Sequence, residues 1–264
     1  MKDKPLITIA TVTYNASDTL ERTLRSVEEQ DYPAVEHLIV DGCSTDNTLS
    51  LVQRYVERNT MVNTPRQIRL LCERDEGLYD AMNKAILQAQ GNYIVFLNAG
   101  DKLHAKDTLS LLVSKVSWVD GDYSNPAILY GETDLVDDNG HFLRHRRLQA
   151  PKELGWRSFL NGMLVCHQSF YVRTDIAREE MYDLRYRFSA DYDWCIRLLQ
   201  KVEKRHIQIL NSKLILTDYL SEGLTTHNHW RSLWERYRIM SQHYGCLAAL
   251  GAHLWFVLRA VLRK

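Results

Sequence analysis

The residues that could carry chemistry begin with a short polar turn, Asn98-Ala99-Gly100-Asp101, which follows an apolar run at residues 93–97. That run is rich in β-branched and aromatic residues, as a strand buried on both faces should be. Ligands of open parallel sheets bind beyond the carboxyl ends of the strands. Asp101, beside an amide side chain and a small glycine, therefore suits a Mg²⁺ or Mn²⁺ ion that carries phosphates. Taken alone, the same four residues also fit an ordinary solvated turn.

Three further polar turns occupy equivalent positions along the chain. Residues 13–15, 41–46 and 75–80 each lie at or just past the end of an expected strand. In a parallel sheet these ends open on one edge, so we expect the four turns to converge there as a nucleotide site. The patterns Gly-x-Gly-x-x-Gly and Gly-x-x-x-x-Gly-Lys-Ser/Thr are absent, which disfavours dehydrogenases and P-loop phosphohydrolases.

Regular elements must position these turns, and the first hundred residues supply them. Apolar runs predict strands at residues 6–12, 35–40, 68–72 and 93–97. Apolar residues at helical spacing predict helices between them, the first through Leu20, Leu24 and Val27. This alternation predicts an α/β fold with a Rossmann-like, mostly parallel central sheet, flanked by helices and joined by right-handed crossovers.

The second half of the chain is less regular. Residues 128–135 and 141–147 flank Asn139-Gly140, a turn signal that predicts a β-hairpin. Pro151 is expected to start a short helix, and residues 163–172 resemble a strand with polar side chains at its start. A helix is predicted through Cys195, Leu198 and Leu199, and Asp191 taken by itself fits an N-cap of that helix.

Composition narrows the class of protein. The 264 residues suffice for one large domain or two small ones, and 45% hydrophobic with 25% charged residues is ordinary for a soluble globular protein. Lysine plus arginine equals aspartate plus glutamate at 33 each, so nucleic acid is not an expected partner. Five cysteines without close spacing indicate neither a zinc site nor a disulfide framework. No signal peptide is visible, and the expected compartment is the cytoplasm.

Residues 6–101 resemble the nucleotide-binding half of family 2 glycosyltransferases. The segments that carry the resemblance are residues 11–15, 40–48, 77–84 and 96–101. The resemblance implies the GT-A fold, a nucleotide-sugar donor, and Mn²⁺ or Mg²⁺ as cofactor. The family usually shows Asp-x-Asp in the last segment, and here Asn98 replaces the first Asp, so the metal site carries one negative charge fewer.

The same resemblance implies roles for individual residues. Asp41 would contact the nucleotide base, the turn of Thr13, Tyr14 and Asn15 would lie near base and ribose, and Asp101 would bind the ion that bridges the diphosphate. The polar turns and the matching segments add the following nucleotide-binding residues: Asp75, Asn83, Asn98, Ala99 and Gly100.

The catalytic base is also implied by the resemblance. Asp191 stands at the helix start where these enzymes carry an acidic pair, although Ala190 occupies the place of the usual Glu. Asp193 is expected to be structural. His167 and Gln168 fit two readings, a lining of the acceptor or donor sugar, or satisfied polar residues in the core. With this base, the resemblance implies inverting transfer of one sugar to an acceptor hydroxyl, a hexosyltransferase-type reaction.

The expected organisation is a GT-A domain over residues 1–226, with a nucleotide-binding half at 1–101 and an acceptor half at 102–226, then a helical tail at 227–264. Residues 220–226 resemble the family's loop that closes near the donor. His227 and His229 have a zinc-like spacing but lack further ligands. The apolar part of the tail is shorter than the roughly 20 residues that span a bilayer. It fits equally a helix on an anionic membrane surface and a helix packed on protein.

The predicted function is transfer of a sugar from a UDP-sugar to a saccharide acceptor. Membrane contact of the tail would suit a polyprenyl-linked acceptor in surface polysaccharide or lipopolysaccharide assembly, at the inner face of the cytoplasmic membrane. The Gln-x-x-Arg-Trp motif of processive members is absent. Two other classes stay open. A sugar-nucleotide nucleotidyltransferase would show a Gly- and Arg/Lys-rich loop that residues 13–17 lack, and a non-catalytic binding module would not need both Asp101 and Asp191.

Overall fold

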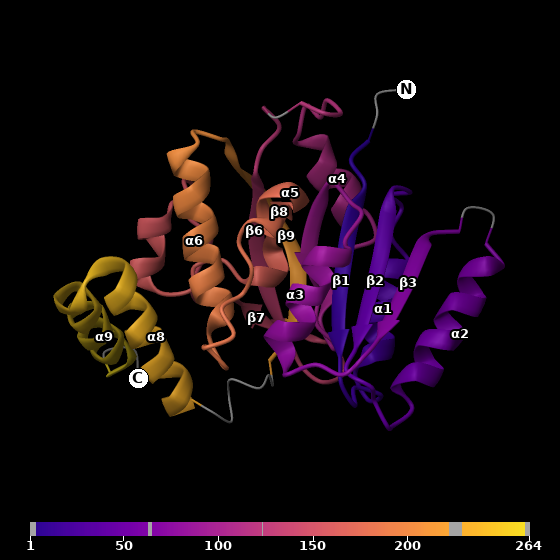
Figure 1. The fold of residues 1–264 in the computed structure, drawn as a ribbon, viewed down its shortest axis with the longest axis horizontal. Helices are drawn as coiled ribbons and strands as arrows, with labels where there is room; N and C mark the ends of the chain where they lie inside the picture. The colour runs from indigo at the N-terminus through magenta and orange to yellow at the C-terminus, as the bar shows by residue number, and fades with distance from the viewer. Residues whose placement is uncertain (1–3, 63–64, 123, 222–228, 262–264) are drawn as a thin grey trace.

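The computed structural model describes residues 4–62, 65–122, 124–221 and 229–261, and every structural statement below refers to these ranges. One mixed sheet crosses the centre of the molecule, with helices on both faces (Figure 1). The elements of the first half are β1 (Ile7–Thr13), α1 (Leu20–Glu28), β2 (Val35–Asp41), α2 (Thr48–Thr60), β3 (Gln67–Cys72), α3 (Leu78–Gln88) and β4 (Tyr93–Phe96). The alternation of strand and helix predicted from the sequence is confirmed.

These four strands form the parallel part of the sheet, in the order β3-β2-β1-β4. Thr13 of β1 is the register partner of Asp41 of β2, which in turn faces Cys72 of β3. The three strands therefore end level with one another, and their arrows point to the same edge in Figure 1. The turns that follow them are brought together at that edge.

The second half completes the sheet with strands of both directions. Its elements are β5 (Lys102–Leu103), α4 (Thr108–Ser114), β6 (Ile128–Val136), β7 (Phe142–His145), η1 (Trp156–Asn161), η2 (His167–Ser169), β8 (Phe170–Arg173), α5 (Thr174–Arg178), α6 (Ala190–Lys204) and β9 (Ile209–Leu220). The sheet continues from β4 as β8-β6-β9-β5, and β7 pairs with β6. β8 is antiparallel to both of its neighbours, and β9 is parallel to β6. The β6–β7 hairpin at Asn139-Gly140 confirms the turn prediction.

Two expectations for this half are wrong. No helix starts at Pro151; the next helical turn is the 3-10 helix η1, which begins at Trp156. Here the hydroxyl hydrogen of Tyr130 in β6 is shared between the carbonyl oxygens of Pro151 (2.8 Å) and Lys152 (3.0 Å), which holds the extended segment against the sheet. The strand expected over residues 163–172 is also shorter, since the polar residues before Phe170 form η2 instead.

Alternate residues of the central strands face different helical layers. In β1, Ile7 and Ile9 pack in the cluster that includes α1 and α4, whereas Ala10 and Val12 pack in the cluster that includes α3 and α6. Burial of each such isoleucine contributes roughly 1.5–3 kcal/mol. Helices therefore pack on both faces of the sheet, and this packing fixes the strand ends that carry the polar turns.

The C-terminal segment forms a helical pair, α8 (His229–Tyr244) and α9 (Cys246–Val261), beside α6 at one end of the molecule (Figure 1). α8 is anchored to α6 by His243, whose Nε2 lies 2.8 Å from Oδ1 of the buried Asp193. Asp193 is therefore structural, as expected. Among the described helices, none combines the length and the apolar character needed to cross a bilayer. The expected domain boundary at residue 226, the loop at 222–226 and His227 lie outside the described residues.

Candidate active site

Asp41, the last residue of β2, organises the first two turns. Its Oδ2 accepts hydrogen bonds from Thr13 Oγ1 (2.8 Å) and Ser44 Oγ (2.6 Å), and its Oδ1 accepts one from Ser44 N (2.7 Å). The carboxylate is fully buried. Donors from two strand ends therefore fix its orientation at the edge of the sheet.

The turns after β1, β2 and β3 meet around Gly42. The backbone N–H of Asn15 donates to Ser44 Oγ (2.8 Å), and Asn15 itself has a φ of 49°, a left-handed conformation that asparagine tolerates. A Cβ atom on Gly42 would lie 2.5 Å from Oδ2 of Asp75 and 3.3 Å from Cδ2 of Tyr14. A larger residue at this position would require the Asp75 side chain to move. Tyr14 remains 65% exposed, which leaves its ring available to a ligand.

Asn83 does not join this cluster through its side chain. From α3, its Nδ2 donates to the carbonyl oxygen of Tyr182 (3.0 Å) and its Oδ1 accepts from the backbone N–H of Tyr182 (2.7 Å). The amide that a nucleotide would use is thus engaged within the protein. The structure favours a structural role for Asn83 in place of the expected nucleotide contact.

Asp101 lies in the turn between β4 and β5 and is 3% exposed. Its Oδ1 accepts a hydrogen bond from the backbone N–H of Leu220 (2.9 Å), and its Oδ2 accepts one from Gln168 Nε2 (3.0 Å). Burial raises the pKa of Asp101 to about 6, against the opposing effect of these hydrogen bonds. A Cβ atom on Gly100 would lie 2.7 Å from Cδ2 of Leu220, so the glycine, with its φ of 99°, lets the end of β9 close over this turn.

His167 connects this turn to Asp191. Asn98 Nδ2 lies 3.3 Å from His167 Nε2, and His167 Nδ1 lies 3.2 Å from Asp191 Oδ2. Because the amide nitrogen of Asn98 can only donate, the neutral imidazole accepts at Nε2 and carries its proton on Nδ1, from which it donates to Asp191. One ring therefore spans the expected metal-binding turn and the expected base. His167 and Gln168, for which the sequence left two readings, both contact expected site residues.

Asp191 lies in the first turn of α6, two residues after Ser189, which is the N-cap residue of that helix. Its Oδ1 accepts hydrogen bonds from the hydroxyl of Tyr79 (3.1 Å) and from the backbone N–H of Tyr192 (2.9 Å). Burial alone would raise the pKa of Asp191, but the hydrogen bond from His167, together with the charge of Arg236, outweighs it and holds the pKa below its ordinary range. The side chain is 21% exposed, so the carboxylate can still meet a substrate.

Three partners in this site were missed by the sequence reasoning. Tyr79 lies within the matching segment 77–84, so a signal existed, but its hydroxyl bonds a residue 112 positions away. The N–H of Leu220 and the guanidinium of Arg236 carry no motif. Arg236 comes from α8, and its Nε is buried without a hydrogen-bond partner among the described residues.

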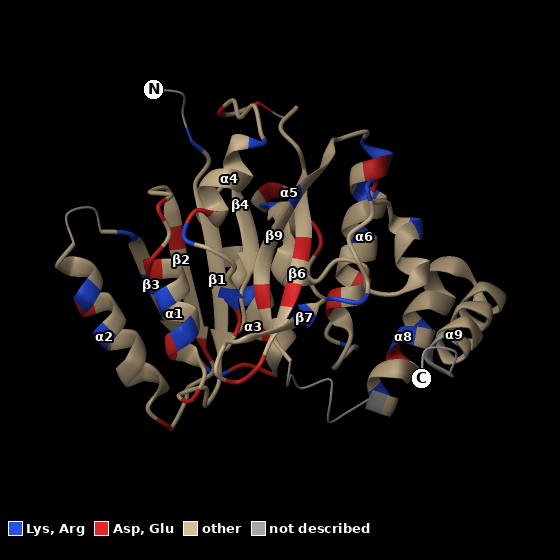
Figure 2. Cartoon of the chain, turned by 180° about the vertical axis from the view of Figure 1, so that it is seen from behind, with Lys and Arg blue, Asp and Glu red and all other residues tan. Residues whose placement is uncertain are grey.

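The residues of the turn fit a hard divalent cation. In this amide orientation Asn98 Oδ1 is buried and has no hydrogen-bond partner among the described residues, so a carbonyl oxygen is left to coordinate. Asp101 adds a carboxylate on the same turn, and oxygen donors are those that Mg²⁺ and Mn²⁺ prefer. Acidic segments gather in the turns at this edge of the sheet, below the strands in Figure 2.

The comparison with known families agrees with this geometry. Residues 8–179 match the profile of glycosyl transferase family 2. The chain is a family 2 glycosyltransferase. This glycosyltransferase is 30% identical over 194 residues to a PGL/p-HBAD biosynthesis glycosyltransferase of Mycobacterium bovis, covering 73% of this chain and 69% of the relative. It is 39% identical over 99 residues to TuaG of Bacillus subtilis, named for teichuronic acid biosynthesis, covering 38% and 37% of the two chains.

Solved structures support the fold of the enzyme. TarS 1–349 of S. aureus in complex with UDP-GlcNAc superposes with a TM-score of 0.61 at 18% identity, covering 92% of this chain and 65% of that chain. The mannosyltransferase PcManGT of Pyrobaculum calidifontis, in complex with GDP-Man and Mn²⁺, gives a TM-score of 0.63 at 18% identity, covering 95% and 74%. The predicted α/β class and GT-A fold are confirmed, with C-terminal helices added.

Proposed function

We propose that this glycosyltransferase is an inverting, divalent-ion-dependent hexosyltransferase that moves one sugar from a UDP-sugar to a hydroxyl of a saccharide acceptor. The observation that carries the proposal is the His167 bridge between the Asn98–Asp101 turn and Asp191. It sets a candidate ion site and a candidate base on either side of one imidazole. A transfer reaction needs both, one at the leaving diphosphate and one at the attacking hydroxyl.

The donor would lie along the edge formed by the polar turns. We assign the nucleotide base and ribose to Asp41 and the turn of Thr13, Tyr14 and Asn15, with Asp75 beside them. The diphosphate would extend toward Asn98, Ala99, Gly100 and Asp101. The UDP-GlcNAc bound to TarS supports a donor with a uridine nucleotide. The GDP-Man bound to PcManGT makes a guanosine nucleotide the alternative donor.

Asp191 would act as the general base. Its lowered pKa keeps it ionised at neutral pH, and the donors Tyr79 and His167 hold both oxygens in place. As the acceptor hydroxyl attacks the anomeric carbon, Asp191 takes its proton, and the bond between that carbon and the diphosphate oxygen breaks on the opposite face. This single displacement inverts the anomeric centre. A divalent ion, held by Asp101 and Asn98 Oδ1, would supply charge that offsets the departing diphosphate.

The acceptor is proposed to be a saccharide on a lipid carrier, with a polyprenyl chain as the carrier, and the enzyme would meet it at a membrane surface. The outer side of α8 and α9 supports this idea, because it carries exposed apolar side chains although the inner side packs on the enzyme. The exposed residues include Trp234, Leu247, Leu250, Leu254, Trp255, Val257 and Leu258. The two relatives are named for PGL/p-HBAD biosynthesis and for teichuronic acid biosynthesis, which supports a role in a biosynthetic pathway of this kind.

Nucleotide binding and transfer together test the proposal. Calorimetry with UDP, GDP and dTDP, each with and without Mn²⁺, should give Mn²⁺-dependent binding of UDP that Asp101→Ala abolishes. Asp191→Asn should bind UDP as the wild type does, while the transfer rate falls by roughly 10²–10⁴. Full transfer activity in Asp191→Asn would exclude it as the base. Binding of no nucleotide by the wild type would overturn the donor assignment, and release of pyrophosphate from UTP and a sugar 1-phosphate would favour a nucleotidyltransferase.

A further inference from the structure

A row of ionisable side chains crosses four neighbouring strands, away from the proposed transfer site. Lys102 of β5 is the register partner of Asp218 of β9, Asp218 faces Asp134 of β6, and Asp134 faces His145 of β7. Register partners in adjacent strands carry their side chains on one face of a sheet. Acidic segments of β6 and β9 accordingly lie side by side in Figure 2.

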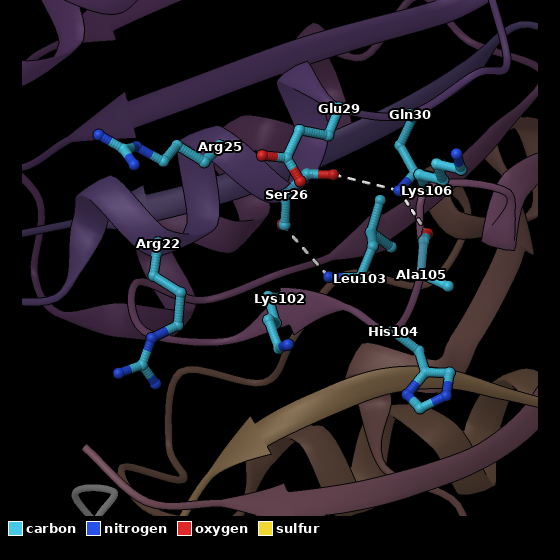
Figure 3. Close-up of a pocket in the computed structure, with 10 residues that line it drawn as sticks. All are labelled: Arg22, Arg25, Ser26, Glu29, Gln30, Lys102, Leu103, His104, Ala105 and Lys106. Carbon is cyan, nitrogen blue, oxygen red and sulfur yellow. Dashed lines mark hydrogen bonds between the residues drawn. The ribbon is translucent and has the colours of Figure 1, made fainter. Parts of the chain in front are cut away.

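His104 joins this row from the end of β5. Its Nδ1 lies 2.7 Å from Asp218 Oδ1, and His145 Nδ1 lies at the same distance, 2.7 Å, from Asp134 Oδ1. His104, Asp134 and Asp218 each offer one possible ligand atom, and these three atoms lie within 4.8 Å of one another. Figure 3 shows Lys102 and His104 extending to one side of the chain, away from α1, with Leu103 pointing the other way.

The charges of this cluster are unevenly compensated. The side chains of Asp134 and Asp218 are only 5% and 8% exposed, so two neighbouring carboxylates are withdrawn from water. Lys102 Nζ, 3.0 Å from Asp218 Oδ2, supplies a single fixed positive charge. Burial would raise the pKa of Asp218, but the hydrogen bonds from His104 and Lys102 hold it below its ordinary range, and the same bond to Asp218 raises the pKa of His104. The contact with Asp218 therefore favours the positively charged form of His104.

We propose that this cluster is a second metal site, which binds a divalent transition-metal ion of the zinc class through His104, Asp134 and Asp218. A divalent cation among these side chains would supply positive charge beside the two buried carboxylates. His145, whose Nδ1 lies 2.7 Å from Asp134 Oδ1, stands beside these three residues, and imidazole with carboxylate is a ligand mixture suited to Zn²⁺. The presence of imidazole distinguishes it from the oxygen-donor site proposed at Asp101.

Binding of an ion requires shifts of the ligand side chains. Ligand bonds of about 2.0–2.2 Å place neighbouring ligand atoms about 3.3 Å apart in a tetrahedral site. The imidazoles must therefore retreat slightly from the carboxylates, and their side chains are 38% exposed for His104 and 70% exposed for His145. His104 also lines a surface cavity of about 240 Å³ between α1 and residues 102–106 (Figure 3).

The location suggests a structural task for the ion. Asp101 immediately precedes Lys102, and Leu220, whose N–H binds Asp101, lies two residues after Asp218. An ion held by β5, β6 and β9 would fix the relative position of the two chain segments that meet at Asp101. The ion would stabilise the position of Asp101 and Leu220 without contacting the substrates.

Cobalt binding by the full chain tests the proposal. Co²⁺ is added without nucleotide to an Asp101→Asn protein, which removes the ligand of the first site, and absorption is recorded. We expect one bound ion per chain with tetrahedral d–d bands and without the charge-transfer band of cobalt–thiolate bonds, which excludes the cysteines. Adding His104→Gln or Asp218→Asn should weaken binding at least about 10-fold. Zn²⁺ should displace Co²⁺.

The matched control is His141→Gln in the same background. His141 Nδ1 lies 3.4 Å from Asp137 Oδ2 on the exposed hairpin, a histidine–carboxylate pair outside the proposed cluster. Its loss should leave Co²⁺ affinity unchanged. Equal weakening in His141→Gln, unchanged binding in His104→Gln, or no bound Co²⁺ at all would each overturn the proposal. His104→Gln decides the matter if Asp218→Asn fails to fold, because His104 lies at the surface.

Discussion

His167 Nδ1 lies 3.2 Å from Asp191 Oδ2, and this hydrogen bond is one of the contacts that set the protonation of the proposed base. Asp191 is largely enclosed, and enclosure disfavours its charged form. The donor groups around it reverse that preference. The ring of His167 is itself held by Asn98, so the ionisation of Asp191 is linked to the turn that would bind the ion.

His167→Ala should move the acid limb of the activity profile to higher pH. The variant loses a hydrogen bond that stabilises ionised Asp191, so the pKa of Asp191 rises and protonation disables the base at a higher pH than in wild type. The measurement is kcat/KM against pH. His167→Gln, which keeps a donor, should shift the limb less, and His141→Ala should not shift it. An unchanged acid limb in His167→Ala would contradict the assignment of Asp191.

Asp101→Asn should stabilise the ligand-free protein at pH 7.5 while abolishing ion-dependent nucleotide binding. The folded pKa of Asp101 is about 6 against an ordinary 3.8, so its stabilising effect exists below pH 3.8 and is lost as pH rises through 6. Asparagine avoids burying that charge. The gain, measured by urea unfolding, is expected at about 1–3 kcal/mol, from roughly two pKa units at about 1.4 kcal/mol each.

The pH dependence of that gain separates charge burial from a packing effect. The difference between Asp101→Asn and wild type should shrink as pH falls from 7.5 to 4.5, because the wild-type carboxyl becomes neutral. Asp137→Asn is the control of opposite sign, since hydrogen bonds from the backbone N–H of His141 and its neighbours lower the pKa of Asp137. Ionised Asp137 therefore stabilises the folded protein at pH values above its ordinary pKa, and this stabilisation is lost as the pH falls. A pH-independent gain in Asp101→Asn would exclude the proposed cause.

The convergence of the polar turns at one edge of the sheet could be predicted from the sequence because local rules determine it. Buried strands and polar turns recur at regular intervals, and a parallel sheet brings their ends together whatever the helices do. Thr13, Asp41 and Asp75 meet for that reason. Asn83 lies in the same matching stretch, yet its amide pairs with Tyr182, and nothing local distinguishes a structural asparagine from a ligand-binding one.

The site contacts made by the second half could not be predicted because they join residues that are distant in the chain. Leu220 binds a carboxylate 119 residues away, and Gln168 reaches Asp101 across 67 residues. β9 itself lacks a clean strand pattern. It is interrupted by Asn211, Ser212 and Lys213, the last with a φ of 58°, and its pairing with β6 shifts register. A strand with such a kink lacks the regular alternation of apolar and polar residues from which strands are predicted.

Replacing Leu247 and Leu254 with Glu should weaken binding of the enzyme to anionic vesicles at least about 10-fold, if the outer side of α8 and α9 enters the lipid interface. Both leucines are exposed, at 87% and 63%, so the changes remove apolar contact with lipid and add charge without disturbing the core. Co-sedimentation with vesicles of anionic and of neutral lipid measures the effect. Leu87→Glu, at a leucine of α3 with 61% exposure, is the matched control and should bind as wild type does. If the wild-type protein binds neither kind of vesicle, or if the double variant binds as well as the wild type, membrane contact through these helices is refuted. Either result would favour a protein partner.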